Sequence, residues 1–165
     1  MIVLDNSVLV AYSQPEDAHH EPAVGLIAAH LGNLVVHSLT LADYMVHPVR
    51  LGEVEDHWEW ITGSLDADNL EIKIVDAPGQ RWPVHLARVR VATKLKMPDA
   101  VVLATALALG GQVATFDEGL MKAARSHGAL LRLERHQPSD RRPLQLQVDH
   151  TNCHPSVATR SGRSR

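Results

Sequence analysis

The amino-acid sequence predicts an α/β fold with three layers, in which helices flank a central parallel sheet of about five strands. Short apolar runs typical of buried strands alternate with longer segments of helical periodicity as far as His136. Strands that are separated by helices need crossover connections, so they lie parallel and the helices cover both faces of the sheet. A chain of 165 residues with 45% hydrophobic content is large enough for one such domain.

The first half of this alternation holds two strands and four helices. The short apolar runs Ile2–Leu4 and Leu34–Val36 predict the strands. Helical periodicity covers Ser7–Tyr12, Asp17–Leu31, Leu39–Arg50 and Glu53–Ser64, and Gly32 ends the second of these helices. The third helix has an apolar stripe that we expect to face the core, formed by Leu39, Ala42, Met45, Val46 and Val49.

The second half holds three more strands and three more helices. The strand-like runs are Leu70–Val75, Gln112–Thr115 and Ala129–Leu133. Helices are predicted over Gly79–Leu95, Pro98–Leu109 and Glu118–Ser126, and the pair Gly110 and Gly111 ends the second of them. Because functional groups gather at the carboxyl ends of parallel strands, the residues directly after these strands are candidates for a site.

A change in composition near His136 divides the chain into a body, residues 1–136, and a tail, residues 137–165. The tail is polar, basic and rich in proline, serine and threonine, so we expect it to be flexible. Leu144–Val148 is the exception, because it alternates apolar and polar residues and suits a strand added to a sheet edge or to a partner.

Composition and charge exclude several classes of protein. Cys153 is the only cysteine, no apolar run approaches the roughly 20 residues of a membrane span, and no signal peptide is recognisable, so we expect a cytoplasmic protein. The body carries 11 Lys and Arg against 17 Asp and Glu, whereas the tail carries 5 Arg against 2 Asp. An acidic body does not bind nucleic acid by bulk charge, although a nuclease whose acids hold metal ions remains possible.

Four acids stand out by their positions. Asp5 directly follows the first strand and Asp117 follows the fourth, although each also suits the N-cap of the next helix. Asp99 lies in the first turn of a helix and heads the face formed by Val102, Leu103, Ala106 and Leu107, which must be buried. Asp43 lies at the edge of an apolar stripe in mid-helix, where an ordinary pairing with His47 or Arg50 is the alternative.

Together these acids predict a metal site. An α/β sheet can bring all four to one rim, where like charges repel one another and raise each other's pKa. A divalent cation is the usual compensation, and ligation by oxygen alone suits Mg²⁺ or Mn²⁺. Such an ion activates water for the hydrolysis of a phosphodiester.

The four acids lie in the segments IVLDNSVLVAY, LTLADYMVHPVR, MPDAVVLATALALGG and QVATFDEGL. In their order and spacing these segments resemble the PIN-domain ribonucleases, specifically the VapC-type toxins of toxin–antitoxin modules, within a similarity that covers Met1–Leu133. The resemblance implies a Mg²⁺-dependent endoribonuclease that cleaves structured RNA, forms homodimers and is neutralised by a cognate antitoxin protein. It implies that Asp5, Asp99 and Asp117 hold the metal, that Thr115 supports the site, and that Asn6 and Ser7 are the polar residues beside the first acid.

Asp43 occupies a position where the family usually has Glu, so it keeps the charge but is one methylene shorter. It either ligates the metal directly or acts through water. Among the cations, Arg50 is a candidate for binding the substrate phosphate, and a solvated surface is the alternative for the basic residues of the long helix. These are Arg81, Arg88, Arg90, Lys94 and Lys96.

Two other readings stay open. A catalytically silent PIN-like domain that binds RNA or a protein is favoured by the short acid Asp43 and opposed by the four retained carboxylates. A phosphatase of the haloacid dehalogenase type needs a second Asp where Ser7 stands.

Trp58 and Trp60 cannot share one helical face, so we expect one to be buried and one exposed. His150, Cys153 and His154 form too weak a pattern to predict zinc.

Overall fold

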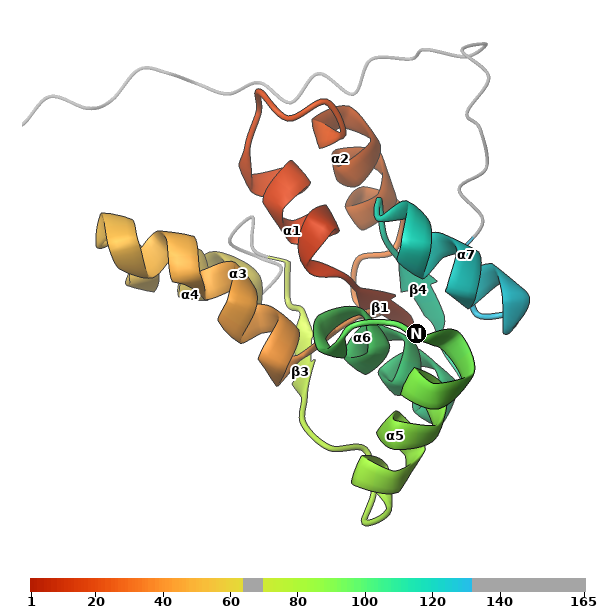
Figure 1. Cartoon of the computed structure of the whole chain (residues 1–165). Coiled ribbons are helices and arrows are strands. Elements are labelled where there is room, and N and C mark those ends of the chain that lie inside the picture. The colour runs from red at the N-terminus through yellow and green to blue at the C-terminus, as the bar shows by residue number, and fades with distance from the viewer. Residues whose placement is uncertain (64–69, 132–165) are drawn as a thin grey trace, which may run out of the picture. The chain divides into compact units, whose positions relative to one another are not determined.

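The strands form one parallel sheet in the order β3-β2-β1-β4. The structure is a computed structural model, and it describes residues 1–63 and 70–131 (Figure 1). The strands are β1 (Ile2–Leu4), β2 (Leu34–His37), β3 (Lys73–Val75) and β4 (Gln112–Ala114). The helices are α1 (Asn6–Ser13), α2 (His20–Ala29), α3 (Ser38–Leu51), α4 (Val54–Thr62), α5 (Trp82–Thr93), α6 (Met97–Leu109) and α7 (Glu118–Ser126).

The central strand β1 pairs with neighbours on both sides. Its Val3 lies opposite Val35 of β2 and Val113 of β4. The predicted fifth strand, Ala129–Leu133, is reduced in the described part of the chain to one bridge between Val113 and Leu130. The turn through Gly128, which has a positive φ of 68°, brings the chain to β4 for only two backbone hydrogen bonds, both made by Val113. The α/β prediction is thus confirmed, with four strands where about five were expected.

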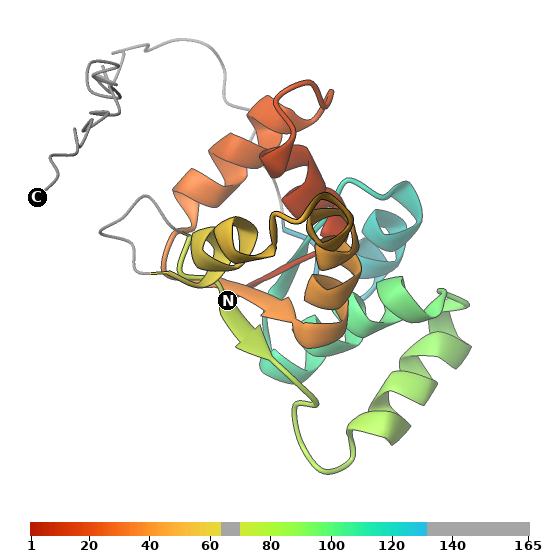
Figure 2. The same ribbon diagram turned by 90° about the vertical axis from the view of Figure 1, so that its left-hand side faces the viewer.

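Alternating side chains of the strands feed two separate apolar clusters, one on each face of the sheet. Ile2 and Leu4 of β1 join the buried residues of α1, α2, α3 and α4. Val3, between them, joins the buried residues of α5, α6 and α7. A strand whose successive side chains are all buried must be covered on both faces, which is the three-layer arrangement that the sequence predicts. Figures 1 and 2 show the two groups of helices around the strands.

Helix α3 buries a different face from the one predicted. Leu39, Val46 and Val49 are 57%, 45% and 61% exposed. The buried face instead holds Thr40, Leu41, Tyr44 and Pro48, which turn toward the neighbouring helices. The reason is the polar end of Tyr44, whose hydroxyl lies 2.6 Å from Nδ1 of His57 in α4 and so permits burial of a large ring.

Several element boundaries also depend on polar contacts. Helix α3 begins after His37, whose Nδ1 accepts a hydrogen bond from the backbone N–H of Leu39 at 3.1 Å. Helix α2 begins at His20, three residues later than predicted, because Asp17 and its neighbours form a turn. In α4, Trp60 packs against the core while Trp58 is 45% exposed, as expected.

Some predictions lie outside the described residues. They concern the tail 137–165, the strand-like run 144–148 and the pattern of histidine and cysteine at 150–154. Within residues 1–63 and 70–131, no helix has the length and apolar character needed to cross a membrane.

Candidate active site

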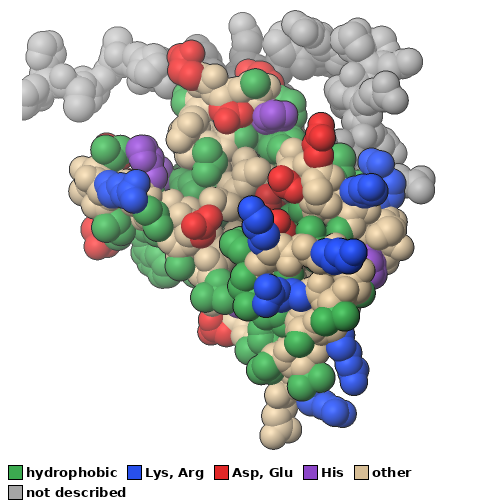
Figure 3. Space-filling model, in the orientation of Figure 1, with side chains coloured by type: hydrophobic (Ala, Val, Ile, Leu, Met, Phe, Trp, Pro, Cys, Tyr) green, Lys and Arg blue, Asp and Glu red, His purple; other side chains and the backbone are tan. Residues whose placement is uncertain are grey.

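The four predicted acids line one pocket, although they come from four distant segments. Asp5 follows β1, Asp43 lies in α3, Asp99 is in the first turn of α6 and Asp117 precedes α7. The pocket has a volume of about 580 Å³. Figure 3 shows acidic side chains gathered near the middle of the displayed face, with basic side chains below them. A second cavity of the same volume, lined in part by Leu26, Met121 and Arg125, contains no carboxylate.

Asp5 is buried at the base of this site and is held by two hydroxyl groups. Both Ser7 Oγ and Thr115 Oγ1 donate to the same carboxylate oxygen, Oδ2, the latter at 2.8 Å. Backbone N–H groups donate in turn to these hydroxyls, from Phe116 to Ser7 at 3.0 Å and from Asp117 to Thr115 at 2.9 Å. Asp5 therefore makes no side-chain cap of α1, and this network leaves Oδ1 for other partners.

Asp117 caps a helix and also lines the pocket. Its Oδ1 accepts a hydrogen bond from the backbone N–H of Leu120 at 2.7 Å, which caps α7. Its side chain also lines the carboxylate pocket, beside Asp5 and Asp99. Because a carboxylate has two oxygens, the cap still leaves Oδ2 available to a ligand.

Asp99 faces the pocket without a hydrogen bond or an ion pair to any described residue. Burial raises the pKa of Asp99, the negative charges of Asp117 and Asp5 raise it further, and Lys96 acts in the opposite direction. The face that Asp99 heads is buried as predicted at Val102, Leu103 and Ala106. The packing of α6 in the core thus holds the carboxylate of Asp99 close to those of Asp5 and Asp117, although like charges repel.

Asp43 is more exposed and is held by a single hydrogen bond. Asn6 donates from Nδ2 to Asp43 Oδ2 at 2.7 Å, and no ion pair joins Asp43 to His47 or Arg50. The remaining oxygen of Asn6, Oδ1, is buried and has no hydrogen-bond partner within the described residues. Asn6 thus holds one acid of the pocket and brings a buried oxygen of its own that has no partner among the described residues.

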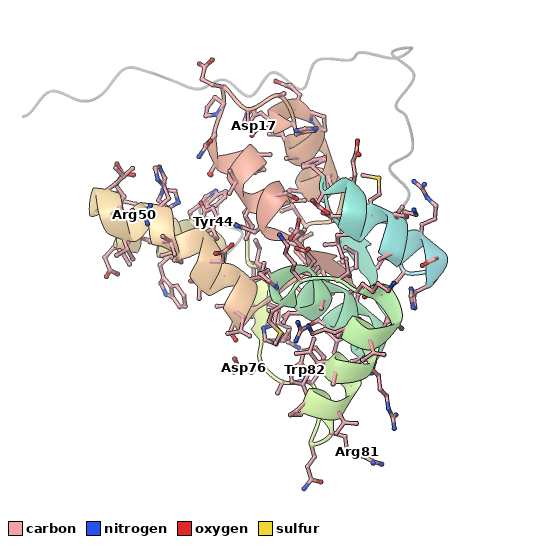
Figure 4. The ribbon with its side chains drawn as sticks, viewed as in Figure 1. Asp17, Tyr44, Arg50, Asp76, Arg81 and Trp82 are labelled. Carbon is pink, nitrogen blue, oxygen red and sulfur yellow. The ribbon has the colours of Figure 1, made fainter. Side chains whose placement is uncertain are left out.

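No described Lys or Arg side chain lines this pocket, although one of them acts on it electrostatically. Arg50 is in the last turn of α3, about 10 Å along the helix from Asp43, and is not among the residues that line the pocket (Figure 4). The basic residues of α5 also lie outside its lining. Lys96, just before α6, is also absent from the lining, but its charge acts on Asp99.

The donor set suits a hard divalent cation. Oxygens of Asp5, Asp99, Asp117 and Asn6 face one space, and the mutual repulsion of the carboxylates is relieved by positive charge. In the described ranges, no three His, Cys, Asp or Glu side chains converge closely enough to form a ready-made metal cage. Mg²⁺ does not require such a cage, because it keeps several waters and is usually held by one or two carboxylates.

Six further residues line the pocket: Ser7, Val10, Asp17, His19, Pro98 and Phe116. The resemblance pointed to Ser7, which fixes Asp5 by a hydrogen bond, but to none of the other five. Asp17 and His19 belong to the turn before α2, and Phe116 lies between Thr115 and Asp117. No sequence pattern pointed to Asp17 or His19, because the turn that brings them to the pocket interrupts a segment that reads as helix.

Comparisons with known proteins agree with this fold. In a search of curated protein sequences, none matches the chain. Among solved structures, the toxin–antitoxin complex from Klebsiella pneumoniae matches with a TM-score of 0.56 at 19% identity, covering 71% of this chain and 87% of that one. FitAcB from Neisseria gonorrhoeae matches with a TM-score of 0.60 at 21% identity, covering 76% and 94%. FitAB bound to an IR36 DNA fragment matches with a TM-score of 0.59 at 22% identity, covering 83% and 100%.

A protein-family model decides the family. The model of the PIN domain matches residues 2–126, which contain all four carboxylates and the residues that hold Asp5. The match covers most of the chain and nearly all of its described helices and strands. The chain therefore belongs to the PIN domain family.

Proposed function

We propose that this protein is a divalent-metal-dependent endoribonuclease that acts as the toxin of a toxin–antitoxin pair in the cytoplasm. The observation that carries the proposal is the pocket in which Asp99 meets Asp5 and Asp117 without an ion pair. Burial and like charge make this arrangement unfavourable unless a cation binds. Membership of the PIN domain family supports nuclease chemistry at that pocket.

In the proposed site, Asp5, Asp99 and Asp117 hold Mg²⁺, and Mn²⁺ substitutes for it. When bound there, such an ion would supply Lewis-acid chemistry, lowering the pKa of a water molecule and offsetting the charge of the phosphodiester. Thr115 and Ser7 hold Asp5 through Oδ2 and leave Oδ1 outside this network. Asn6 positions Asp43, which would act on the ion through water because its side chain is one methylene shorter than Glu.

Two basic side chains are candidates to bind phosphates of the substrate. Lys96 lies close enough to act on Asp99, so it is the first candidate to bind a phosphate of the RNA. Arg50 remains a candidate for a phosphate further along the strand, because it is exposed at the end of α3. Neither residue is needed to hold the metal.

The partner proposals rest on similarity and on exposed apolar surface. Structures of toxin–antitoxin and FitAB complexes are similar in fold, which supports a cognate antitoxin as partner. A second copy of this chain is the proposed occupant of the exposed stripe of α3, whose residues Leu39, Val46 and Val49 recur at the spacing of helix pairs. Self-association is also supported by opposite charges, because α4 carries exposed acidic residues and α5 carries exposed basic residues.

Expression in a bacterial host tests the proposed function. Wild type is expected to arrest growth and to leave discrete RNA fragments, whereas Asp99→Asn does neither. Glu118→Gln is the matched control, because Glu118 is next to Asp117 but does not line the pocket. If the wild-type protein folds but neither arrests growth nor cuts RNA in the cell or after purification, the nuclease proposal is wrong. The silent binding domain then takes its place.

A further inference from the structure

One pair of aromatic rings lies among the residues of the carboxylate pocket. The ring of His19 stacks on the ring of Phe116, with 4.7 Å between their centroids and 24° between their planes. Both residues line the pocket together with the four carboxylates. The metal chemistry proposed above uses neither ring, so the pair needs an explanation of its own.

His19 is fixed by the turn between α1 and α2. Oδ1 of Asp17 accepts a hydrogen bond from the backbone N–H of His19 at 2.7 Å and lies 3.5 Å from Nδ1 of its ring. The turn is closed by backbone hydrogen bonds from Asp17 to Gln14 at 2.9 Å and from His20 to Asp17 at 3.0 Å. Figure 4 labels Asp17 in this turn. The ring is therefore held in place before any ligand arrives.

Phe116 is fixed by the same network that orients Asp5. Its backbone N–H donates to Ser7 Oγ at 3.0 Å, and Ser7 Oγ donates to Asp5. Phe116 is partly buried against the core and supports one face of the His19 ring. The His19 side chain is 55% exposed, so part of its surface remains open to solvent. An aromatic ring that is supported on one side and open on another provides a surface on which a further ring can stack.

The charge of the pocket indicates which kind of ring would stack on His19. A pocket with five carboxylates, those of Asp17 and the four predicted acids, repels the phosphates of a nucleic acid. A contact that does not depend on charge helps to hold the strand there, in addition to the charged contacts proposed above. Stacking on an aromatic side chain is such a contact, and it is available to unpaired bases because paired bases are already stacked in a helix.

We propose that His19, supported by Phe116 and Asp17, is a stacking platform for one unpaired base of the RNA substrate. The proposal rests on the proposed ribonuclease function and adds to it where the enzyme cuts: next to an unpaired nucleotide. His19 is a positioning residue in this account. It orients the strand and takes no part in the transfer of a proton.

Cleavage of an RNA hairpin with an unpaired 2-aminopurine in its loop tests the platform. His19→Ala is expected to raise KM about tenfold or more, the effect of losing one stacked base, with a smaller change in kcat. His19→Phe, which keeps an aromatic ring, restores KM. His47→Ala is the matched control, since it removes an exposed histidine from α3, outside the pocket. The four proteins must have the same melting temperature for the comparison to count.

Binding measured without cleavage separates this proposal from the proposed function. In the Asp99→Asn background, binding is expected to quench 2-aminopurine, and adding His19→Ala abolishes the quenching. If His19→Ala keeps the wild-type KM and quenching, the platform is wrong and the ribonuclease stands. If wild type cuts no RNA but quenches 2-aminopurine through His19, the platform stands in a silent domain. If wild type neither cuts nor quenches, both proposals are wrong.

Discussion

Helices α6 and α3 each bring one carboxylate to the same pocket, but they are held in the protein in opposite ways. Every residue of α6 from Ala100 to Ala106 is buried, and the side chain of Asp99, which heads this run, has no hydrogen bond to any described residue. Helix α3 buries only one narrow face and exposes its most apolar stripe. Its Asp43 is exposed and depends on a single hydrogen bond from Asn6.

The two acids are therefore held in position by different interactions. The core packing of α6 holds Asp99 close to Asp5 and Asp117 although their charges repel, so the position of Asp99 does not depend on electrostatics. The position of Asp43 depends on one polar contact with the neighbouring helix α1. We therefore expect Asp99 to belong to the fixed part of the metal site and Asp43 to its adjustable part.

The largest expected effect is the difference in cleavage between substitutions of these two acids. Asp99→Asn removes a proposed direct metal ligand and is expected to reduce kcat/KM by roughly a thousandfold or more. Asp43→Asn removes a group proposed to act through water and is expected to cost about 10- to 100-fold. Single-turnover cleavage rates of the two variants measure the difference. Equal losses would mean that Asp43 ligates the metal directly.

Lengthening Asp43 sharpens the same comparison. Asp43→Glu is expected to retain or raise the cleavage rate, because the longer acid reaches the metal site that Asp43 serves through water. Asn6→Ala removes the hydrogen bond that positions Asp43 and is expected to lower the rate as Asp43→Asn does. Complete inactivation by Asp43→Glu would contradict the adjustable role.

The next largest difference is expected between the two helices in how much truncating a side chain lowers stability. Leu103→Ala in α6 leaves a cavity in a fully buried position and is expected to lower the free energy of unfolding by about 2–5 kcal/mol. Val46→Ala in α3 removes an exposed side chain and is expected to change it by less than about 0.5 kcal/mol in the monomer. Denaturant unfolding at low protein concentration measures both. A large loss for Val46→Ala at that concentration would show that the outer face of α3 is packed within the single chain.

Metal binding is expected to stabilise the folded state by a smaller amount. Mn²⁺ at a hundred times its dissociation constant raises the free energy of unfolding of wild type by about 2.7 kcal/mol. Asp99→Asn is expected to show little of this increase, whereas Glu118→Gln shows all of it. Thermal unfolding with and without Mn²⁺ makes the comparison. An equal increase in Asp99→Asn would place the metal elsewhere.

The smallest effect concerns the pH dependence of stability without metal. Because burial and two neighbouring acids raise the pKa of Asp99, the folded state binds its proton more tightly than the unfolded chain does. Stability is therefore lost as the pH rises from the ordinary value of 3.8 through the raised pKa. Asp99→Asn is expected to be more stable than metal-free wild type at pH 7, with the gain disappearing below pH 3.8. A variant less stable than wild type at pH 7 would make Asp99 a structural cap.

The sequence predicts this fold and site best where local pattern and burial agree. Helix α6 is apolar on almost every face, so any packing arrangement buries it and leaves Asp99 at the rim. Helix α3 offers two faces of similar character, and the choice between them depends on the contact of Tyr44 with His57, which no local pattern contains. The turn of Asp17 and His19 escaped prediction for the same reason, since long-range contacts give it its place in the pocket.

Hydrolysis of an end-labelled RNA by the purified protein tests the central claim most directly. Wild type with Mg²⁺ is expected to produce discrete fragments, and chelation of the metal or Asp99→Asn is expected to stop their formation while the protein stays folded. Cleavage that persists after chelation, or in Asp99→Asn, would contradict the claim that the pocket of Asp5, Asp43, Asp99 and Asp117 works through a bound metal ion.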